Sequence, residues 1–219
     1  SVSLPTSAAQ GAIAVGILFV NKLVATFGSA ALAGFGIAFR MESIAVLPAL
    51  ALGIATLTMI GQNIGAKQYG RVRLASMFSS LSAFLFMEGI GIMFFLTSPL
   101  LISIFTSSPE VIAYGKQYFS IVALAYGFIG LRFIAASSFQ GLGKAWQVLG
   151  ITTTTFAVMI PLALFLGHKF GITGVWWGVA TAHIVAGLFA QLWFQNTLRN
   201  AERLRLFNSA AVAKKFDSI

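Results

Sequence analysis

Five ionisable side chains lie inside long apolar stretches of this sequence, where a charge is unexpected. They are Lys22, Arg40, Glu42, Glu88 and Arg132. If these stretches cross a bilayer, each such charge costs roughly 2.5–3.5 kcal/mol on the insertion scale. That cost must be offset by an ion pair or by contact with water in a cavity. The two acids, Glu42 and Glu88, are therefore the candidates for proton exchange or cation binding. Lys22, Arg40 and Arg132 are their possible charge partners, and structural ion pairs are the alternative.

Glu42 is the first candidate among them. Arg40 is two residues away and cannot share its helix face, so Arg40 is not an obvious neutralising partner and Glu42 can face a cavity. A carboxylate in such a place could exchange a proton or bind a cation as the cavity opens to either side. A structural salt bridge to Lys22 or Arg132 is the alternative. Glu88 has the same two interpretations, and for Glu88 the structural one is favoured.

The depth of each charge along its helix predicts which charges could meet. Lys22 lies near the outer end of the first stretch, and Glu42 lies about 12–15 Å below the outer end of the second at 1.5 Å per residue. A Lys22–Glu42 contact is therefore plausible. Glu88 lies near mid-depth and Arg132 somewhat closer to the cytoplasm, so these two could pair only if both side chains are extended.

Two prolines and two amides are further candidates for lining a polar pathway. Pro48 and Pro161 lie inside apolar stretches, where each removes a backbone hydrogen bond and kinks its helix. Such a break can act as a hinge or expose carbonyl groups to a cavity, and a static kink is the alternative. Gln10 and Asn21 place polar groups on the first stretch.

Composition limits what the whole chain can be. Hydrophobic residues make up 58% of the 219 residues and charged residues only 9%, against about 45–50% and 25% in soluble domains. This balance excludes a soluble enzyme, a disordered tail and a nucleic-acid-binding module. The chain has no cysteine and only two isolated histidines, and it contains no catalytic constellation. We therefore predict a membrane protein that is not an enzyme and binds no metal cluster.

Six stretches are long and apolar enough to cross a bilayer, which needs about 20 residues. They cover approximately residues 4–27, 32–60, 74–97, 114–140, 145–167 and 172–196. The predicted fold is an all-α bundle of six transmembrane helices over residues 1–196, followed by a basic tail over residues 197–219. The apolar segment at 99–109 is expected to lie at the membrane surface. Because the first stretch begins almost at Ser1, we expect the sequence to be a piece of a longer protein.

The Lys and Arg residues between these stretches predict the orientation. Nine lie in the connection at residues 66–73, the connection at 141–144 and the tail, against two on the opposite side. By the positive-inside rule both ends of the chain are cytoplasmic, in a bacterial-type inner membrane. The net charge of +9 thus reflects topology and not a nucleic-acid partner. Residues 197–207 could rest as an amphipathic helix on anionic lipid, or form a solvated end.

The second and fourth stretches contain several landmark residues. The second stretch carries Arg40 and Pro48 and ends in Gly61-Gln62-Asn63-Ile64-Gly65-Ala66, and the fourth ends in Gln140-Gly141-Leu142-Gly143-Lys144. Together these landmarks resemble the multidrug and toxic compound extrusion (MATE) family. The residues Gly61, Gln62, Asn63, Gly65 and Ala66 make physical sense as a helix end. Gln62 and Asn63 can bond the last carbonyl groups, and Gly65 permits a left-handed terminus, so we interpret this motif as architectural.

The resemblance implies one half of a transporter with twelve helices, built as two six-helix bundles around a central cleft. Such proteins export organic cations and drugs in exchange for sodium ions or protons, without another cofactor. The expected partners are the lipid bilayer, the N-terminal half of the same protein and a small organic cation. In some members an acid on the first helix of the C-terminal half binds the coupling cation. Residues 4–27 contain no acid here, which shifts the expectation to Glu42.

Two alternatives to drug export stay open at this point. A related fold could flip lipid-linked intermediates across the membrane. A structural membrane protein without transport would use its buried charges only in pairs.

Overall fold

The computed structural model describes the backbone of residues 3–216 and the side chains of residues 7–200. Over this range the chain is helical apart from short connections. The elements are α1 (Ser3–Ala25), α2 (Ser29–Ala45), α3 (Leu47–Gly65), α4 (Tyr69–Ser103), α5 (Pro109–Val122), η1 (Ala123–Ala125), α6 (Tyr126–Gly141), α7 (Ala145–Phe170) and α8 (Ile172–Phe216).

These helices form six apolar spans among the described residues, as the sequence predicts. They are Ser7–Ala25, Ser29–Gly65, Tyr69–Ser103, Pro109–Gly141, Ala145–Phe170 and Ile172–Asn200. The protein is thus a multi-pass membrane protein with an all-helical fold. Only a helix or a closed barrel satisfies every backbone polar group inside lipid, and the Leu-, Ile-, Ala- and Phe-rich stretches satisfy theirs as helices.

The second span is divided at Val46, just before Pro48. The kink expected from Pro48 is present, and it separates α2 from α3. Hydrogen bonding continues across the division, because the Val46 N–H donates to the Glu42 carbonyl and the Leu50 N–H to the Val46 carbonyl, each at 3.0 Å. By contrast α7 runs through Pro161 as one continuous helix.

The fourth span, Pro109–Gly141, is also divided, which the sequence analysis did not anticipate. The short 3₁₀ turn η1 separates α5 from α6, although residues 114–140 contain no proline. The expected surface segment at residues 99–109 is also shorter than predicted. Because α4 continues through Pro99 to Ser103, the connection to α5 consists only of residues 104–108.

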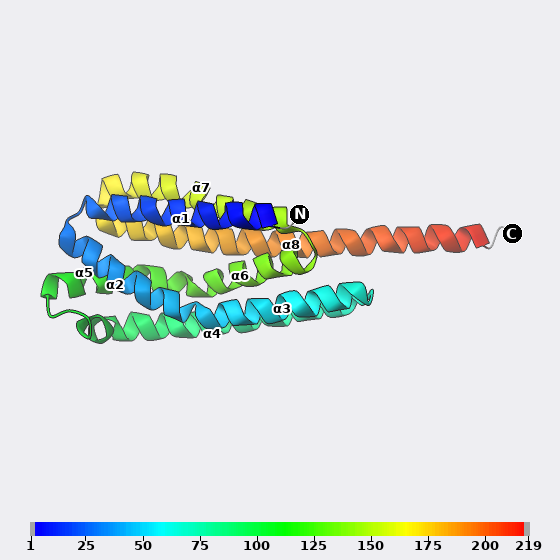
Figure 1. Ribbon diagram of the computed structural model, residues 1–219, viewed down its shortest axis with the longest axis horizontal. Coiled ribbons are helices and arrows are strands. Elements are labelled where there is room, and N and C mark those ends of the chain that lie inside the picture. Colours follow the sequence, from blue (N-terminus) through cyan, green and yellow to red (C-terminus); the bar gives the residue numbers. More distant parts are fainter. Residues whose placement is uncertain (1–2, 217–219) are drawn as a thin grey trace.

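The connections with most basic residues lie at one end of the bundle. In Figure 1 the α3–α4 and α6–α7 connections lie at the end that also holds the N-terminus, and the α1–α2, α4–α5 and α7–α8 connections lie at the opposite end. The last helix differs from the predicted span of 172–196, since α8 continues to Phe216 and projects beyond the bundle (Figure 1). Side chains from residue 201 onward lie outside the described part, so the lipid contact predicted for residues 197–207 stays a prediction.

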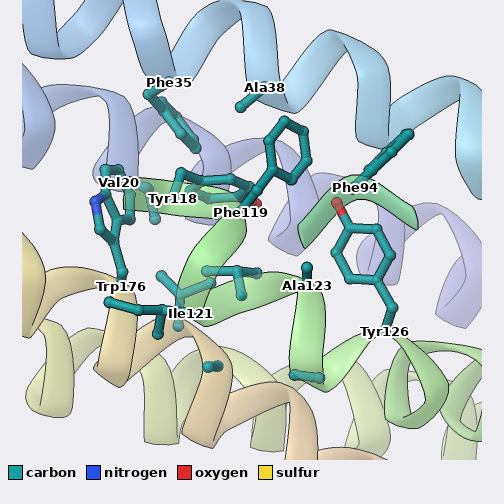
Figure 2. Close-up of a cluster of buried hydrophobic side chains, with 14 of the residues drawn as sticks. Val20, Phe35, Ala38, Phe94, Tyr118, Phe119, Ile121, Ala123, Tyr126 and Trp176 are labelled. Carbon is teal, nitrogen blue, oxygen red and sulfur yellow. The ribbon is translucent and has the colours of Figure 1, made fainter. Parts of the chain in front are cut away.

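Aromatic side chains from four spans form the centre of the larger core (Figure 2). The Phe35 ring of α2 stacks on Trp176 of α8 at 5.4 Å between centroids. Tyr118 of α5 meets Trp176 edge-on at 5.0 Å. Phe94 of α4 and Phe119 of α5 meet edge-on at 4.9 Å. Edge-on and stacked pairs of this kind fix ring orientation as well as burying area, so this cluster sets how the two halves of the fourth span are rotated.

Candidate functional site

Glu42 lies near the end of α2, and its side chain is buried. One carboxylate oxygen, Oε2, accepts hydrogen bonds from two phenolic hydroxyl groups. The Tyr118 hydroxyl donates at 2.5 Å and the Tyr126 hydroxyl at 3.2 Å. Hydrogen bonds of this kind offset the cost of burying a carboxylate.

The two tyrosines were missed in the sequence analysis. They belong to α5 and α6, on either side of the η1 turn, and both are part of the aromatic cluster in Figure 2. A signal was available, because a Tyr buried in an apolar span requires a partner for its hydroxyl group.

Beside Glu42 lies a partly open cavity of about 230 Å³. Its wall is built by α1, α2, α5, α6, α7 and α8. The lining residues are Ile13, Gly16, Ile17, Val20, Phe35, Phe39, Glu42, Ser43, Val46, Tyr118, Ile129, Arg132, Phe133, Thr155, Phe156, Met159, Val179 and His183. The expectation that Glu42 faces a cavity agrees with this geometry.

Arg132 of α6 and His183 of α8 bring two further polar groups to the same wall. The Nε atom of Arg132 and the Nδ1 atom of His183 are buried without a hydrogen-bond partner. The Arg132 guanidinium lies 5.0 Å from the centroid of the Phe133 ring, and Arg132 lines the same cavity as Glu42. The sequence analysis proposed Arg132 as a partner of an acid but set His183 aside as isolated.

The expected Lys22–Glu42 contact is not formed. Lys22 is exposed on α1, whereas Glu42 is turned inward against α5 and α6. Arg40 is exposed on α2, as expected for a residue that does not share the face of Glu42. The hydrogen-bond partners of Glu42 in the described part of the chain are therefore uncharged hydroxyl groups, and Arg132 is a cation on the same cavity wall.

Glu88 serves a different purpose. Its Oε2 atom accepts a hydrogen bond of 2.9 Å from the backbone N–H of Gly127, in the first turn of α6. A carboxylate at this position satisfies a free N–H group and complements the positive end of the helix dipole. The stretched Glu88–Arg132 pair considered above is not formed among the described residues, because this carboxylate is engaged by the divided fourth span.

The remaining pathway candidates lie away from this cavity. Gln10 is exposed, and the Asn21 amide donates to the carbonyl of Ile17 in its own helix at 3.0 Å. Pro48 lines a hollow between α3 and α4, and Pro161 lines one between α1 and α7. None of the four belongs to the wall beside Glu42.

The motif at residues 61–66 ends α3, as predicted, but its left-handed residue differs from the expected one. The Asn63 amide donates to the Met59 carbonyl at 2.7 Å. The residue with positive φ is Lys67, at 59°, and not Gly65. The Lys67 N–H donates to Ile64 and the Gln68 N–H to Asn63, at 3.0 and 2.8 Å. This is the Schellman pattern, in which the left-handed residue follows the helix cap.

The end of α6 repeats the pattern with a glycine. Gly143 has a φ of 71°, and the Lys144 N–H donates to the Phe139 carbonyl at 2.9 Å. The two helix ends lie close together, since a Cβ atom added at Gly141 would lie 2.8 Å from the Leu57 carbonyl oxygen. Both motifs therefore shape the same end of the bundle, on the side away from the aromatic cluster.

Comparison with known proteins identifies the family. The MatE family model matches residues 5–165. The probable multidrug resistance protein YpnP of Bacillus subtilis is 28% identical over 195 residues, which is 89% of this chain and 44% of that protein. The probable multidrug resistance protein NorM of Thermotoga maritima is 27% identical, over 90% of this chain and 41% of its own length. A protein of Shewanella oneidensis named FAD transporter is 25% identical over 77% of this chain and 38% of its length.

Solved structures agree in fold and in extent. The MATE transporter VcmN of Vibrio cholerae in its bent form superposes with a TM-score of 0.85 at 28% identity, over 90% of this chain and 45% of that one. A MOP superfamily transporter from Pyrococcus furiosus shares the fold, with a TM-score of 0.85 at 21% identity over the same shares. The chain thus spans less than half the length of these relatives. Its helical bundle and the match over residues 5–165 show that the chain belongs to the MATE family.

Proposed function

We propose that this chain is the C-terminal six-helix half of an efflux transporter that exports organic cations and drugs in exchange for sodium ions or protons. The observation that carries the proposal is Glu42, a buried carboxylate that accepts hydrogen bonds from two tyrosine hydroxyl groups on the wall of a partly open cavity. The multidrug relatives support the direction and kind of transport. The span of less than half their length supports an N-terminal partner half in the same protein.

Glu42 lies close to two points at which a membrane span is divided. Glu42 lies four residues before the division at Val46, and its two hydroxyl donors lie on either side of the η1 turn. When a proton or a cation binds at Glu42, the ability of its Oε2 atom to accept hydrogen bonds from the two tyrosine hydroxyl groups changes. The rotation of α5 and α6 relative to α2 then changes with it, and a ligand shifts a conformational equilibrium only through such differential contacts. Alternating access follows if this half moves against the other.

The proposed setting is a bacterial-type inner membrane with both ends of the chain in the cytoplasm. The two most basic connections described lie at the same end of the bundle as the N-terminus (Figure 1), which is the arrangement that the positive-inside rule requires. The lipid bilayer surrounds the apolar outer faces, where residues such as Leu81, Phe78 and Leu85 are exposed.

The test uses the full-length protein in vesicles with an imposed sodium or proton gradient. Glu42→Gln keeps the shape and hydrogen-bonding capacity of the side chain but cannot exchange charge, so we expect gradient-driven export to be lost in a protein that still inserts and folds. Glu110→Gln, which changes an exposed acid at the start of α5, is the matched control and should transport normally.

Two substrates are assayed separately, a cationic dye and FAD, because the relatives' names include both multidrug proteins and an FAD transporter. Normal transport by folded Glu42→Gln would remove this residue from the mechanism. Loss of transport together with loss of thermal stability would assign Glu42 a structural role. No movement of either substrate under any gradient would overturn the export proposal itself.

A further inference from the structure

We propose that Phe156 of α7 limits the size of the organic cation that this half accepts, because its ring separates the cavity beside Glu42 from a second hollow at the surface of the bundle. This role rests on the proposed export of organic cations and adds to it the residue that selects among them by size. It is tested by binding, without a gradient, and therefore stands or falls separately from the coupling role of Glu42.

The second hollow lies between α1 and α7 and has a volume of about 470 Å³. Its lining is apolar apart from one threonine and consists of Ala12, Val15, Gly16, Thr153, Phe156, Ala157, Ile160 and Pro161. Two of these residues, Gly16 and Phe156, also line the cavity beside Glu42. The two spaces are therefore neighbours, and Gly16 and Phe156 form the boundary between them.

Gly16 provides the place in which the Phe156 ring lies. A Cβ atom added at Gly16 would overlap the Cδ1, Cε1 and Cζ atoms of that ring, so the ring fills the space that a side chain at this position would need. The absence of a side chain also lets α1 and α7 approach each other closely. Phe156 is only partly buried, and a phenyl ring forms no hydrogen bond that would fix it. A change to another staggered rotamer moves the ring off Gly16 and connects the two spaces.

The volumes indicate what the closed boundary excludes. Pockets for drug-sized ligands usually have volumes of about 300–1,000 Å³, whereas the cavity beside Glu42 has only about 230 Å³. With the Phe156 ring in place, this cavity suits a cation with a single aromatic ring. When the ring is displaced, the hollow between α1 and α7 is added, and the joined space reaches the range of a cation with several rings.

The backbone next to Phe156 lacks one helical hydrogen bond. Pro161 has no N–H group to donate to the Ala157 carbonyl, although α7 continues through it, and both residues line the hollow between α1 and α7. Proline is a common point at which a helix bends. The turn that follows Phe156 is therefore the part of α7 that adjusts most easily when a large ligand displaces the ring.

The test compares the binding of two cations to the purified full-length protein. Benzyltrimethylammonium has one ring and is titrated calorimetrically, and ethidium has several rings and is followed by its fluorescence. Phe156→Ala deletes the ring from the boundary, so we expect ethidium to bind at least about fivefold more tightly. Benzyltrimethylammonium, which already fits, should change by less than about twofold.

Gly16→Ala is the second variant, because it opens the same boundary while Phe156 stays intact. The added methyl group takes the place of the ring, which lies at the end of a flexible side chain and moves aside. Ethidium binding should again become tighter, and the double variant should gain no more than the larger single effect. Gly11→Ala on α1 and Phe165→Ala on α7 are the matched controls. A Cβ atom at Gly11 meets nothing within 4 Å, Phe165 is exposed, and neither residue lines either space.

Several outcomes overturn the role of Phe156. They are an unchanged ratio of the two affinities in Phe156→Ala, weaker ethidium binding in Gly16→Ala, and effects of the two substitutions that add in full. Loss of both cations together with a lower melting temperature in Phe156→Ala and Phe156→Leu would assign the ring a packing role only. If Phe156→Ala favours ethidium while Glu42→Gln exports normally, the size limit stands and the coupling role of Glu42 fails. If Glu42→Gln abolishes export while Phe156→Ala changes neither affinity, the proposed function stands and the size limit fails.

Discussion

At the scale of single residues, the buried Glu42 carboxylate is stabilised by hydrogen bonds and not by an ion pair. Moving a carboxylate out of water costs on the order of several kcal/mol. Tyr118 and Tyr126 offset part of this cost, because both donate hydrogen bonds to one carboxylate oxygen. Hydroxyl donors leave the carboxylate free to exchange a proton or small cation, because they hold no opposing charge that must be displaced. A Lys22 partner would have held Glu42 permanently.

A direct test is to remove the shorter of the two hydrogen bonds that Glu42 accepts. Tyr118→Phe keeps the ring in the aromatic cluster and deletes only the 2.5 Å donor, so we expect a loss of about 1.5–3 kcal/mol, as for a hydrogen bond to a charged group. Tyr126→Phe, at 3.2 Å, should cost less. Unfolding of the full-length protein in detergent measures both. Tyr114→Phe on the same helix is the control, and an equal loss there would contradict a special role for Tyr118.

At the scale of elements, the divided fourth span is the feature that arranges the site. The η1 turn frees the Gly127 N–H for Glu88 and places the neighbouring Tyr126 hydroxyl at Glu42. Tyr126 and Gly127, the first two residues of α6, therefore contact the two acids that lie within the spans. Close packing holds this arrangement, since a Cβ atom at Gly130 would lie 2.7 Å from the Ala83 carbonyl oxygen of α4.

Two substitutions of Glu88 separate its role as a hydrogen-bond acceptor for α6 from the effect of its negative charge. Glu88→Gln keeps a side-chain oxygen for the Gly127 N–H and should change stability little. Glu88→Ala leaves that N–H without its acceptor and should cost about 1–3 kcal/mol. Denaturant unfolding of the two variants in the same detergent gives the comparison. Equal destabilisation by Gln and Ala would mean that the negative charge, and not the acceptor, is what α6 requires.

At the scale of the whole molecule, the six spans and the charge asymmetry decide how the chain sits in the bilayer. The chain has no cysteine, so an introduced cysteine is the single thiol of this half, and the unsubstituted full-length protein is the labelling control. Gly70→Cys lies in the basic α3–α4 region, where a Cβ atom meets nothing within 4 Å, and Ser107→Cys lies in the exposed connection between α4 and α5.

The orientation predicts opposite labelling of these two positions. A membrane-impermeant maleimide should label Ser107→Cys in intact cells, and Gly70→Cys only after the membrane is opened. Both proteins should retain export, because neither position lies in the cavity wall. The reverse labelling pattern would place the Lys67 connection outside and contradict the proposed topology.

The class of molecule and the number of spans could be predicted from the sequence alone. A bilayer forces each backbone polar group to be paired within its own segment, so a run of about 20 apolar residues is sufficient to predict a helix. The same contrast between charge and apolar surroundings identified Glu42, Glu88 and Arg132. The helix end at residues 61–66 was also recognisable, although Lys67 and not Gly65 takes the left-handed conformation.

Which of these residues contact one another could not be predicted from the sequence and depends on how the spans pack. The η1 division, the tyrosine partners of Glu42 and the convergence of Arg132 with His183 all join different spans. Such contacts depend on how each helix is rotated and tilted against its neighbours. In lipid, apolar periodicity does not set that rotation, because the surroundings are as apolar as the core. Close backbone approaches and aromatic packing set it instead, and these arise only when all the spans are assembled.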